Sequence, residues 1–271
     1  MLKGATLRGM DSSTAQSAQL KNSPVVLVTG GAKRIGKAIS LAFAKAGWRV
    51  AIHFNSSQTE ANETLHELLS CGVDAMMLQA DLANETQTRG LIPAVCGRFD
   101  RIDAVVNNAS RFELDDAASF QYAHLAAHMA SNLAAPLVLS QALHDALQPN
   151  QEGVVINLLD QKLYNLNPDF LSYTMTKAGL AAATVMLAKA LAPRVRVVGV
   201  APGLTLASYL QDESSFARAH QVSVLNRSSD LGDIAATVLF AATNRSITGS
   251  TILVDGGQHL LSLPRDISLM P

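Results

Sequence analysis

The sequence predicts an α/β fold in which one doubly wound, seven-stranded parallel sheet carries helices on both faces. Three observations lead to this prediction. Seven short apolar runs alternate with helical patterns, the runs are apolar almost throughout, and no linker composition or internal repeat divides the chain. Strands covered on both faces have this apolar character, and alternating strands and helices build a parallel sheet.

The first unit is the clearest. The β-branched run Val25–Val28 stops at Thr29-Gly30-Gly31, and an apolar helical stripe that includes Ile35 and Ile39 ends at Gly47. The other runs predict strands at residues 49–54, 75–79, 102–106, 153–158, 194–200 and 250–254, and helices at about residues 59–70, 85–96, 122–147, 172–191 and 231–242. Between residues 204 and 229 the sequence is polar, and we assign no helix there.

Composition excludes several classes of partner. Charged residues make up 16% of the 271 residues and the formal net charge is −1, so no electrostatic footprint suggests nucleic acid or an anionic membrane. No apolar run approaches the length of a membrane span. Cys71 and Cys96 form no C-x-x-C pair and predict reduced thiols in a cytoplasmic protein. We expect small-molecule partners or copies of the chain itself.

The composition of the N-terminal residues predicts where the domain begins. Residues 1–23 are polar and rich in Ser, Gln and Ala, without the apolar segment of a secretory signal. We interpret them as a disordered N-terminal extension. Residues 24–271 form the predicted domain.

Polar and glycine residues recur where the predicted strands end. Thr29-Gly30, Asp81, Asn107-Asn108-Ala109 and Pro202-Gly203 each follow a strand. In a doubly wound sheet, ligands bind beyond the carboxyl ends of the strands, and a glycine turn before a helix holds a phosphate on free N–H groups. Ordinary turn residues are the alternative for each position alone, but their recurrence favours dinucleotide binding.

The end of the second strand favours NADPH over NADH. An acidic residue there would accept a hydrogen bond from the ribose 2′-OH of NAD. The sequence instead continues Asn55-Ser56-Ser57, and Arg34 in the glycine turn brings a cation to the same corner. Hydroxyl, amide and guanidinium donors suit a 2′-phosphate, although Arg34 could also be a solvated loop charge.

Tyr173 and Lys177 are the candidate catalytic pair. Their spacing of four residues places the phenol and the ammonium on one helix face. A nearby ammonium is expected to lower the pKa of the phenol and make Tyr173 a usable proton donor. A Tyr-x-x-x-Lys pair is common by chance, so its weight comes from its place after the fifth strand.

From about Pro24 to Leu260 the chain resembles the short-chain dehydrogenase/reductase family, whose domain is of the Rossmann type. The matching elements are Thr29-Gly30…Gly36, Asp81, Asn107-Asn108-Ala109, Asn132, Tyr173/Lys177 and Pro202-Gly203. The resemblance implies that Tyr173 is the catalytic acid, that Lys177 holds the nicotinamide ribose, that Asn132 anchors a proton-relay water and that Asp81 faces the adenine. It also implies a homotetramer built on the alanine-rich helix 173–191.

Two departures from the family pattern narrow the function. Arg34 stands where a second glycine is usual, and Asp160 replaces the serine normally found about thirteen residues before the tyrosine. A carboxyl group there can bind or protonate a ring nitrogen, as reduction of a C=N bond requires. Both departures resemble the pteridine reductase branch, including the bacterial dihydromonapterin and dihydrofolate reductases. In that branch an aromatic residue at the position of Phe112 stacks on the pterin.

The sequence therefore predicts NADPH-dependent reduction of a pterin or dihydropterin. The expected cofactor residues are Gly30, Lys33, Arg34, Ile35, Asn55, Ser56, Ser57, Asp81, Leu82, Asn108, Ala109, Tyr173, Lys177, Pro202 and Gly203. The expected substrate residues are Arg34, Ser110, Phe112, Asp160 and Tyr173, and the catalytic set is Asp160, Tyr173, Lys177 and Asn132.

Several alternatives stay open from the sequence. The chain could be a carbonyl-reducing enzyme for a keto-acyl or sugar substrate, or a catalytically silent NADP-binding regulator in which Asp160 only caps a strand end. His124 and His128 lie four residues apart on a helix, but no third ligand has a defined spacing, so we favour packed or solvated histidines and expect no metal. The segment 204–227, where the family carries its substrate lid, matches nothing that fixes substrate specificity.

Overall fold

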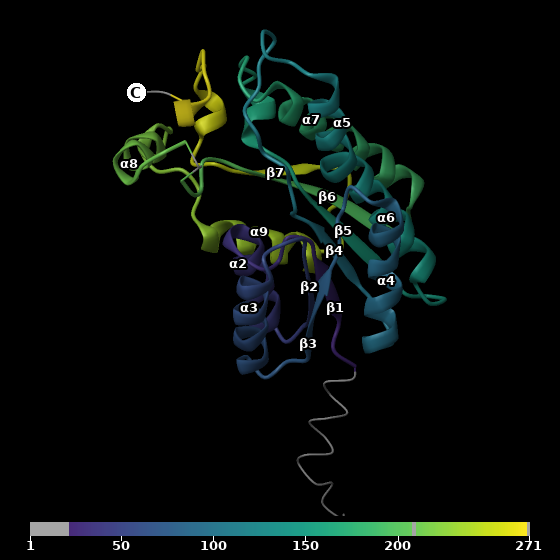
Figure 1. Ribbon diagram of the computed structural model, residues 1–271. Coiled ribbons are helices and arrows are strands. Elements are labelled where there is room, and N and C mark those ends of the chain that lie inside the picture. Colours follow the sequence, from purple (N-terminus) through teal and green to yellow (C-terminus); the bar gives the residue numbers. More distant parts are fainter. Residues whose placement is uncertain (1–21, 208–209, 270–271) are drawn as a thin grey trace, which may run out of the picture.

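The computed structural model describes residues 22–207 and 210–269, so the predicted extension at residues 1–23 lies outside the described residues except for its last two. Figure 1 shows a twisted sheet between two layers of helices. Its seven strands are parallel and follow the order β3-β2-β1-β4-β5-β6-β7. They span Val25–Val28 (β1), Arg49–Phe54 (β2), Ala75–Gln79 (β3), Ala104–Asn107 (β4), Gly153–Leu158 (β5), Val195–Pro202 (β6) and Thr251–Val254 (β7). The predicted fold class is confirmed.

Each face of the sheet is buried under its own helices (Figure 1). Side chains alternate along a strand, so Val26 and Val28 enter one core while Val25 and Leu27 enter the other. The first core is closed by α2 (Arg34–Lys45), α3 (Gln58–Ser70) and α9 (Leu231–Thr243). The second is closed by α4 (Glu85–Phe99), α6 (Ala135–Ala146) and α7 (Leu171–Ala190).

The strand order places the reversal of the sheet between β1 and β4. From β1 the chain builds outward through β2 and β3, and then returns to place β4 on the other side of β1. Val28 pairs with both Ile52 and Val106, so the carboxyl ends of these three strands are level. Such a reversal opens a crevice beyond the strand ends, which is where a doubly wound sheet binds its ligand.

The long helix predicted over residues 122–147 is interrupted, which corrects the sequence prediction. It consists of α5 (Tyr122–Met129), a π-helical turn (Ala130–Ala134) and α6. Pro136, in the first turn of α6, has no N–H to donate to the carbonyl of Asn132, so a continuous α-helical ladder cannot pass this point. Single π turns are frequent at functional sites, and this one contains Asn132.

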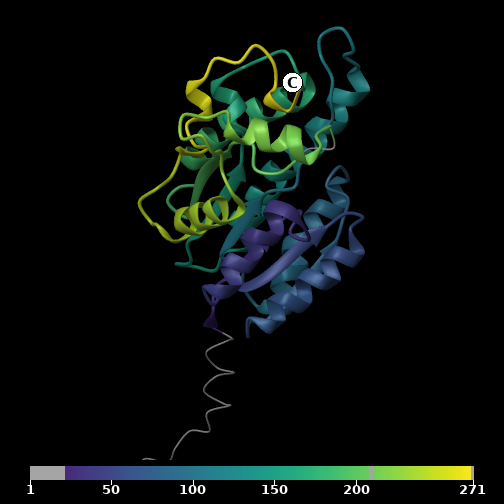
Figure 2. The same ribbon diagram turned by 90° about the vertical axis from the view of Figure 1, so that its left-hand side faces the viewer.

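The polar segment after β6 contains a helix that the sequence analysis did not assign, α8 (Glu213–Gln221). Its N-terminus is capped by Asp212, whose carboxylate accepts the N–H of Ser215. Figure 2, turned by 90° from Figure 1, shows this helix beside the C-terminal part of the chain, and α8 contacts the 3₁₀ turn Ile267–Leu269 there. Within residues 22–207 and 210–269, we find no helix with the length and apolarity that a membrane span requires.

Candidate active site

The glycine turn after β1 is folded tightly against the start of α2. Gly30 has a φ of +61°, and a Cβ on Gly36 would lie 2.0 Å from the carbonyl oxygen of Gly30. Position 36 therefore excludes any residue with a side chain. The side chain of the N-cap residue, Lys33, makes no capping hydrogen bond within the described structure, so the first N–H groups of α2 are available for an anion.

Two side chains fix this turn, one from β2 and one from the loop after β4. The amide nitrogen of Asn108 donates to the carbonyls of Thr29 (2.9 Å) and Gly30 (3.2 Å). Buried His53 accepts the N–H of Gly30 at Nδ1 (3.2 Å), while its Nε2 lies 3.0 Å from the carbonyl of Ala80, which makes Nε2 the protonated nitrogen. Burial lowers the pKa of His53, consistent with this neutral tautomer. The sequence analysis missed His53, whose polarity inside an apolar strand was the available signal.

Arg34 adopts the backbone conformation that glycine would normally supply. Its φ is +54°, and its guanidinium donates to the carbonyl of Ala207 (3.0 Å) across the mouth of the site. A left-handed residue with a side chain costs about 1–2 kcal/mol. The chain keeps this strained conformation and places a cation at the start of α2.

Replacing Arg34 with glycine is expected to separate stability from cofactor binding. The strain is relieved, so the midpoint of thermal unfolding stays level or rises, whereas loss of a charge-assisted contact to the predicted 2′-phosphate raises the KM for NADPH about tenfold. Arg245→Ala, which removes an exposed cation away from the turn, serves as the control. An unchanged KM in Arg34→Gly would remove Arg34 from the cofactor site.

The carboxyl group of Asp160 and the phenol of Tyr173 form a hydrogen-bonded pair. Asp160 follows β5, and Tyr173 lies in the first turn of α7. The Tyr173 hydroxyl donates to Oδ2 of Asp160 at 2.7 Å, while Oδ1 of Asp160 accepts the N–H of Lys162 at 2.8 Å. Asp160 therefore caps the 3₁₀ turn Gln161–Tyr164 with one oxygen and contacts Tyr173 with the other.

Burial governs the ionisation of this pair. Removal from water raises the pKa of the Asp160 carboxyl, and the hydrogen bonds from Lys162 and Tyr173 only partly oppose this. The pKa of the Tyr173 phenol is raised well above its ordinary value by burial and by the facing carboxylate of Asp160. The sequence-based prediction that Lys177 lowers the pKa of this phenol is therefore wrong. The phenol keeps its proton at neutral pH.

The ammonium group of Lys177 is buried behind the pair. It donates to the carbonyl of Leu158 at 2.6 Å and lies 5.6 Å from the centre of the Tyr173 ring. Burial lowers its pKa to about 8, with the charge of Asp160 acting in the opposite direction. The spacing of four residues does place Tyr173 and Lys177 on one face, but Lys177 contacts the strand end rather than the phenol oxygen.

The lowered pKa of Lys177 predicts a pH dependence. Its positive charge is present below pH 8 and is lost as the pH rises through about 8, so kcat/KM for NADPH, which reports groups of the free enzyme, falls above that pH. A profile measured from about pH 6 to about pH 10 checks this. A flat profile over that interval would show that the charge of Lys177 is not needed for cofactor capture.

The side chain of Asn132 is engaged with its surroundings. Its oxygen accepts the N–H of Arg111 at 2.7 Å, and its nitrogen donates to the carbonyl of Arg111 (2.9 Å) and to Thr176 (3.2 Å). Asn132 thus joins the loop after β4 to α7. Four residues after Asn132, Pro136 has no N–H to donate to the main-chain carbonyl of Asn132.

A cavity of about 470 Å³ unites most of the predicted residues at the sheet reversal. Its predicted lining residues are Arg34, Ile35, Asn108, Ser110, Phe112, Asp160, Tyr173, Lys177, Pro202 and Gly203. The remaining predicted positions do not line it: Gly30, Lys33, Asn55, Ser56, Ser57, Asp81, Leu82, Ala109 and Asn132. Asn55, Ser56 and Asp81 are exposed beyond β2 and β3. Gly30 lies in the glycine turn, and Ala109 contacts this turn from the loop after β4.

Phe112 presents an aromatic wall to this cavity. Its ring stacks on the ring of Phe170, with 4.2 Å between the ring centroids, and packs edge-on against the ring of Tyr173, with 4.8 Å between the centroids. Ser110 is exposed at the same wall, and its hydroxyl lies 3.3 Å from the carbonyl of Arg111. The ring of Phe112 is thus fixed beside the proton donor rather than buried in either main core.

The cavity lining also includes a segment that the sequence did not predict. Asp266, Ile267 and Ser268 line the cavity, and ion pairs tie the segment to the loop before α7. Arg265 pairs with Asp169 at 2.8 Å, and Asp266 pairs with buried Lys162 at 2.7 Å. Residues so near the chain end carry no local pattern that predicts this return to the site.

The chain belongs to the short-chain dehydrogenase family, whose model matches residues 24–217. Two solved structures of FolM alternative dihydrofolate reductase 1, both complexed with NADP, are similar to it. The protein from Brucella suis is 43% identical with a TM-score of 0.85, covering 89% of this chain and 97% of its own. The Brucella canis protein is 41% identical with a TM-score of 0.83, covering 90% and 96%. A 3-oxoacyl-[acyl-carrier-protein] reductase from Synechocystis is 32% identical over 245 residues, covering 86% and 96%.

Proposed function

We propose that this chain uses NADPH to reduce a C=N bond of a pterin or dihydropterin. The observation that carries the proposal is the contact between the Asp160 carboxyl and the Tyr173 hydroxyl at 2.7 Å. A ketone reductase of this family has a serine at the position of Asp160, and its hydroxyl serves a carbonyl oxygen. A carboxyl group whose pKa is raised by burial instead suits a basic ring nitrogen, to which it can donate a proton.

NADPH supplies the hydride that adds to the ring carbon of the C=N bond, and the ring nitrogen must then gain one proton. In the proposed path the Asp160 carboxyl donates its proton to the ring nitrogen. Tyr173, whose hydroxyl donates to Oδ2 of Asp160, then supplies Asp160 with a new proton. Lys177, between the end of β5 and the Tyr173 ring, binds the nicotinamide ribose. The carbonyl of Asn132 anchors the water that returns a proton to Tyr173.

The cofactor residues divide between two places along the strand ends. The turn from Gly30 to Gly36 and the start of α2 receive the pyrophosphate. Arg34, the exposed Asn55 and Ser56, and the partly buried Ser57 receive the 2′-phosphate, and Asp81 faces the adenine. The NADP complexes of the two Brucella relatives support this assignment of the cofactor.

The substrate is placed by aromatic stacking. Phe112 is held between Phe170 and Tyr173, so a flat heterocycle that stacks on it lies beside the proton donor. Arg34, which reaches over the cavity mouth to Ala207, contacts the pterin from the side of the cofactor phosphates. An acyl chain would make apolar contact with this aromatic wall but could not stack on it as a flat ring does.

A carbonyl reductase is the second candidate, since the Synechocystis relative is a 3-oxoacyl-[acyl-carrier-protein] reductase. The higher identity of the FolM relatives, 41% and 43% against 32%, favours the pterin. A silent NADP-binding regulator would have no use for the Asp160–Tyr173 contact.

Parallel assays of NADPH oxidation distinguish the three functions. The substrates are dihydrobiopterin, dihydromonapterin, dihydrofolate and a β-keto thioester. Turnover of at least one pterin and not the thioester is expected. Turnover of the thioester alone would replace the proposal with carbonyl reduction, and tight NADPH binding without any turnover would favour the regulator.

The proposed assembly is a homotetramer with α7 at an interface. This helix leaves the side chains of Met175, Val185 and Met186 exposed, with Met186 at 69% of its full exposure. Large apolar side chains grouped on one helix favour contact with another copy. The native mass, measured by light scattering, is expected to equal four chains, and a monomer mass would contradict this.

A further inference from the structure

Three potential metal ligands meet where the loop after β4 packs against α5. Glu113 comes from this loop, and His124 and His128 come from successive turns of α5. A carboxylate oxygen and one ring nitrogen of each histidine lie within 4.8 Å of one another. The sequence analysis discounted the histidines because it had no third ligand. The fold supplies one from a loop, where spacing along the chain carries no signal.

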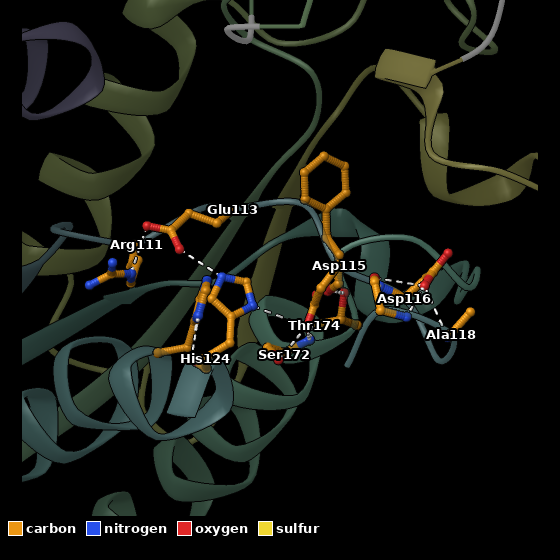
Figure 3. Close-up of polar contacts among 11 residues, drawn as sticks. Arg111, Glu113, Asp115, Asp116, Ala118, His124, Ser172 and Thr174 are labelled. Atoms are coloured by element: carbon orange, nitrogen blue, oxygen red, sulfur yellow. Dashed lines mark hydrogen bonds and ion pairs between the residues drawn. The ribbon is translucent and has the colours of Figure 1, made fainter. Parts of the chain in front are cut away.

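His124 is oriented by carboxylates on both sides. Its Nε2 lies 2.6 Å from Oε2 of Glu113, and its Nδ1 lies 3.3 Å from Oδ2 of Asp115. Figure 3 shows the imidazole between these two acids. Asp115 is itself fixed, because the main-chain N–H and the hydroxyl of Ser172 both donate to it. A histidine whose second nitrogen donates to a carboxylate is a typical arrangement for a metal ligand.

His128 provides the second, independent observation. Its side chain is fully buried, and its Nδ1 lies 2.9 Å from the carbonyl of His124, to which it donates. Its Nε2 is then an acceptor, and this buried atom has no hydrogen-bond partner among the described residues. A buried polar atom without a partner costs about 1–3 kcal/mol, and a bound cation would use its lone pair.

A network without a metal explains only part of this cluster. A protonated His124 could donate to both carboxylates, and Arg111 already pairs with Oε1 of Glu113 at 2.8 Å. Such a network leaves Nε2 of His128 unused. A metal ion uses all three groups, with Oε2 of Glu113 as ligand while Arg111 retains Oε1.

We propose that Glu113, His124 and His128 bind a divalent transition metal ion, with Zn²⁺ as the ion best suited to them. Two imidazoles and one carboxylate are a known zinc ligand set that leaves a fourth position for water. Zinc ligands at about 2.0–2.1 Å require the three groups to draw together from their present spacing. The side chains of Glu113 and His124 are only partly buried, at 41% and 23% exposure, which gives them room to make this movement.

The site is peripheral to the proposed chemistry but connected to it. Glu113 follows Phe112 directly, and Asp115 holds Ser172 directly before Tyr173. A metal that joins Glu113 to α5 would fix the loop that carries the aromatic wall. The inference does not depend on the pterin reaction, because binding and stability report it without any substrate.

The test uses the full chain without a polyhistidine tag. Zn²⁺ binding is measured by calorimetry and by elemental analysis after dialysis, and the midpoint of thermal unfolding is followed with Zn²⁺ and with Mg²⁺. We expect one zinc per chain and a higher midpoint of thermal unfolding with Zn²⁺. Mg²⁺ should leave the midpoint unchanged, because imidazole ligands do not suit Mg²⁺. Glu113→Gln and His124→Gln, whose side chains are not fully buried, should each weaken zinc binding about tenfold or more.

His144→Gln is the matched control, since His144 is a partly exposed histidine on α6 outside the cluster. It should bind zinc as the unmodified chain does. Zinc binding that survives in the Glu113→Gln/His124→Gln double variant would overturn the site. The site would also be overturned if Mg²⁺ raised the midpoint of unfolding as much as Zn²⁺ does, or if the unmodified chain bound no zinc with zinc in excess.

Discussion

Replacing Asp160 with serine abolishes pterin reduction and leaves the affinity for NADPH nearly unchanged. The serine restores the residue that ketone reductases of this family carry, but it removes the only carboxyl group in contact with the Tyr173 hydroxyl among the described residues. General acid–base groups contribute a factor of about 100 to 10,000 to a rate, and a loss in kcat of this size is expected. Steady-state kinetics and a fluorescence titration with NADPH measure the two effects.

Asp160→Asn is the matched control for this variant. The amide keeps an oxygen for the N–H of Lys162 and nearly the same volume, so the 3₁₀ turn and the folding stability are retained. It has no titrating proton, and it should be as inactive as the serine variant. If either variant keeps full pterin activity, Asp160 is not part of the mechanism.

Replacing Tyr173 with phenylalanine is expected to have an effect of similar size. The ring and its packing against Phe112 remain, but the hydroxyl that donates to Asp160 is lost, together with the replacement proton. A fall in kcat of about 100- to 10,000-fold is expected, with the KM for NADPH changed little. Single-turnover kinetics on a dihydropterin would separate this loss from slow product release.

The double variant Asp160→Asn/Tyr173→Phe tests whether the two residues act as a unit. Residues of one catalytic unit are non-additive, so the double variant should be about as active as either single variant. Multiplication of the two losses would show that Asp160 and Tyr173 act independently, contrary to the proton path proposed here.

The fold was predictable because its signals are local and repeated. Each strand is an apolar run that ends in a turn residue, and the seven runs leave few topologies for a doubly wound sheet. The exact bounds of β3 and β5 followed from such runs. The interruption of the long helix was not predicted, although Pro136 was visible within it.

The candidate site could be predicted only where its residues follow strand ends or lie four apart on a helix. Arg34, Asp160 and Tyr173 are such residues, and the fold brings them to one cavity. His53 was missed because its partner is the main chain of the glycine turn after β1, and the wall at Asp266 was missed because it depends on distant ion pairs. The pKa of Tyr173 could not be read from the sequence, since it is set by burial and by the contact with Asp160.

The most direct test of the central claim follows the hydride itself. The enzyme is given a dihydropterin and NADPH that carries deuterium at the transferable position of the nicotinamide, and the product is analysed by mass spectrometry and NMR. The account predicts a tetrahydropterin with one deuterium on the ring carbon of the former C=N bond, formed by the unmodified enzyme and not by Asp160→Asn. An unlabelled pterin, in a preparation that transfers the deuterium to the carbonyl carbon of a β-keto thioester, would contradict it.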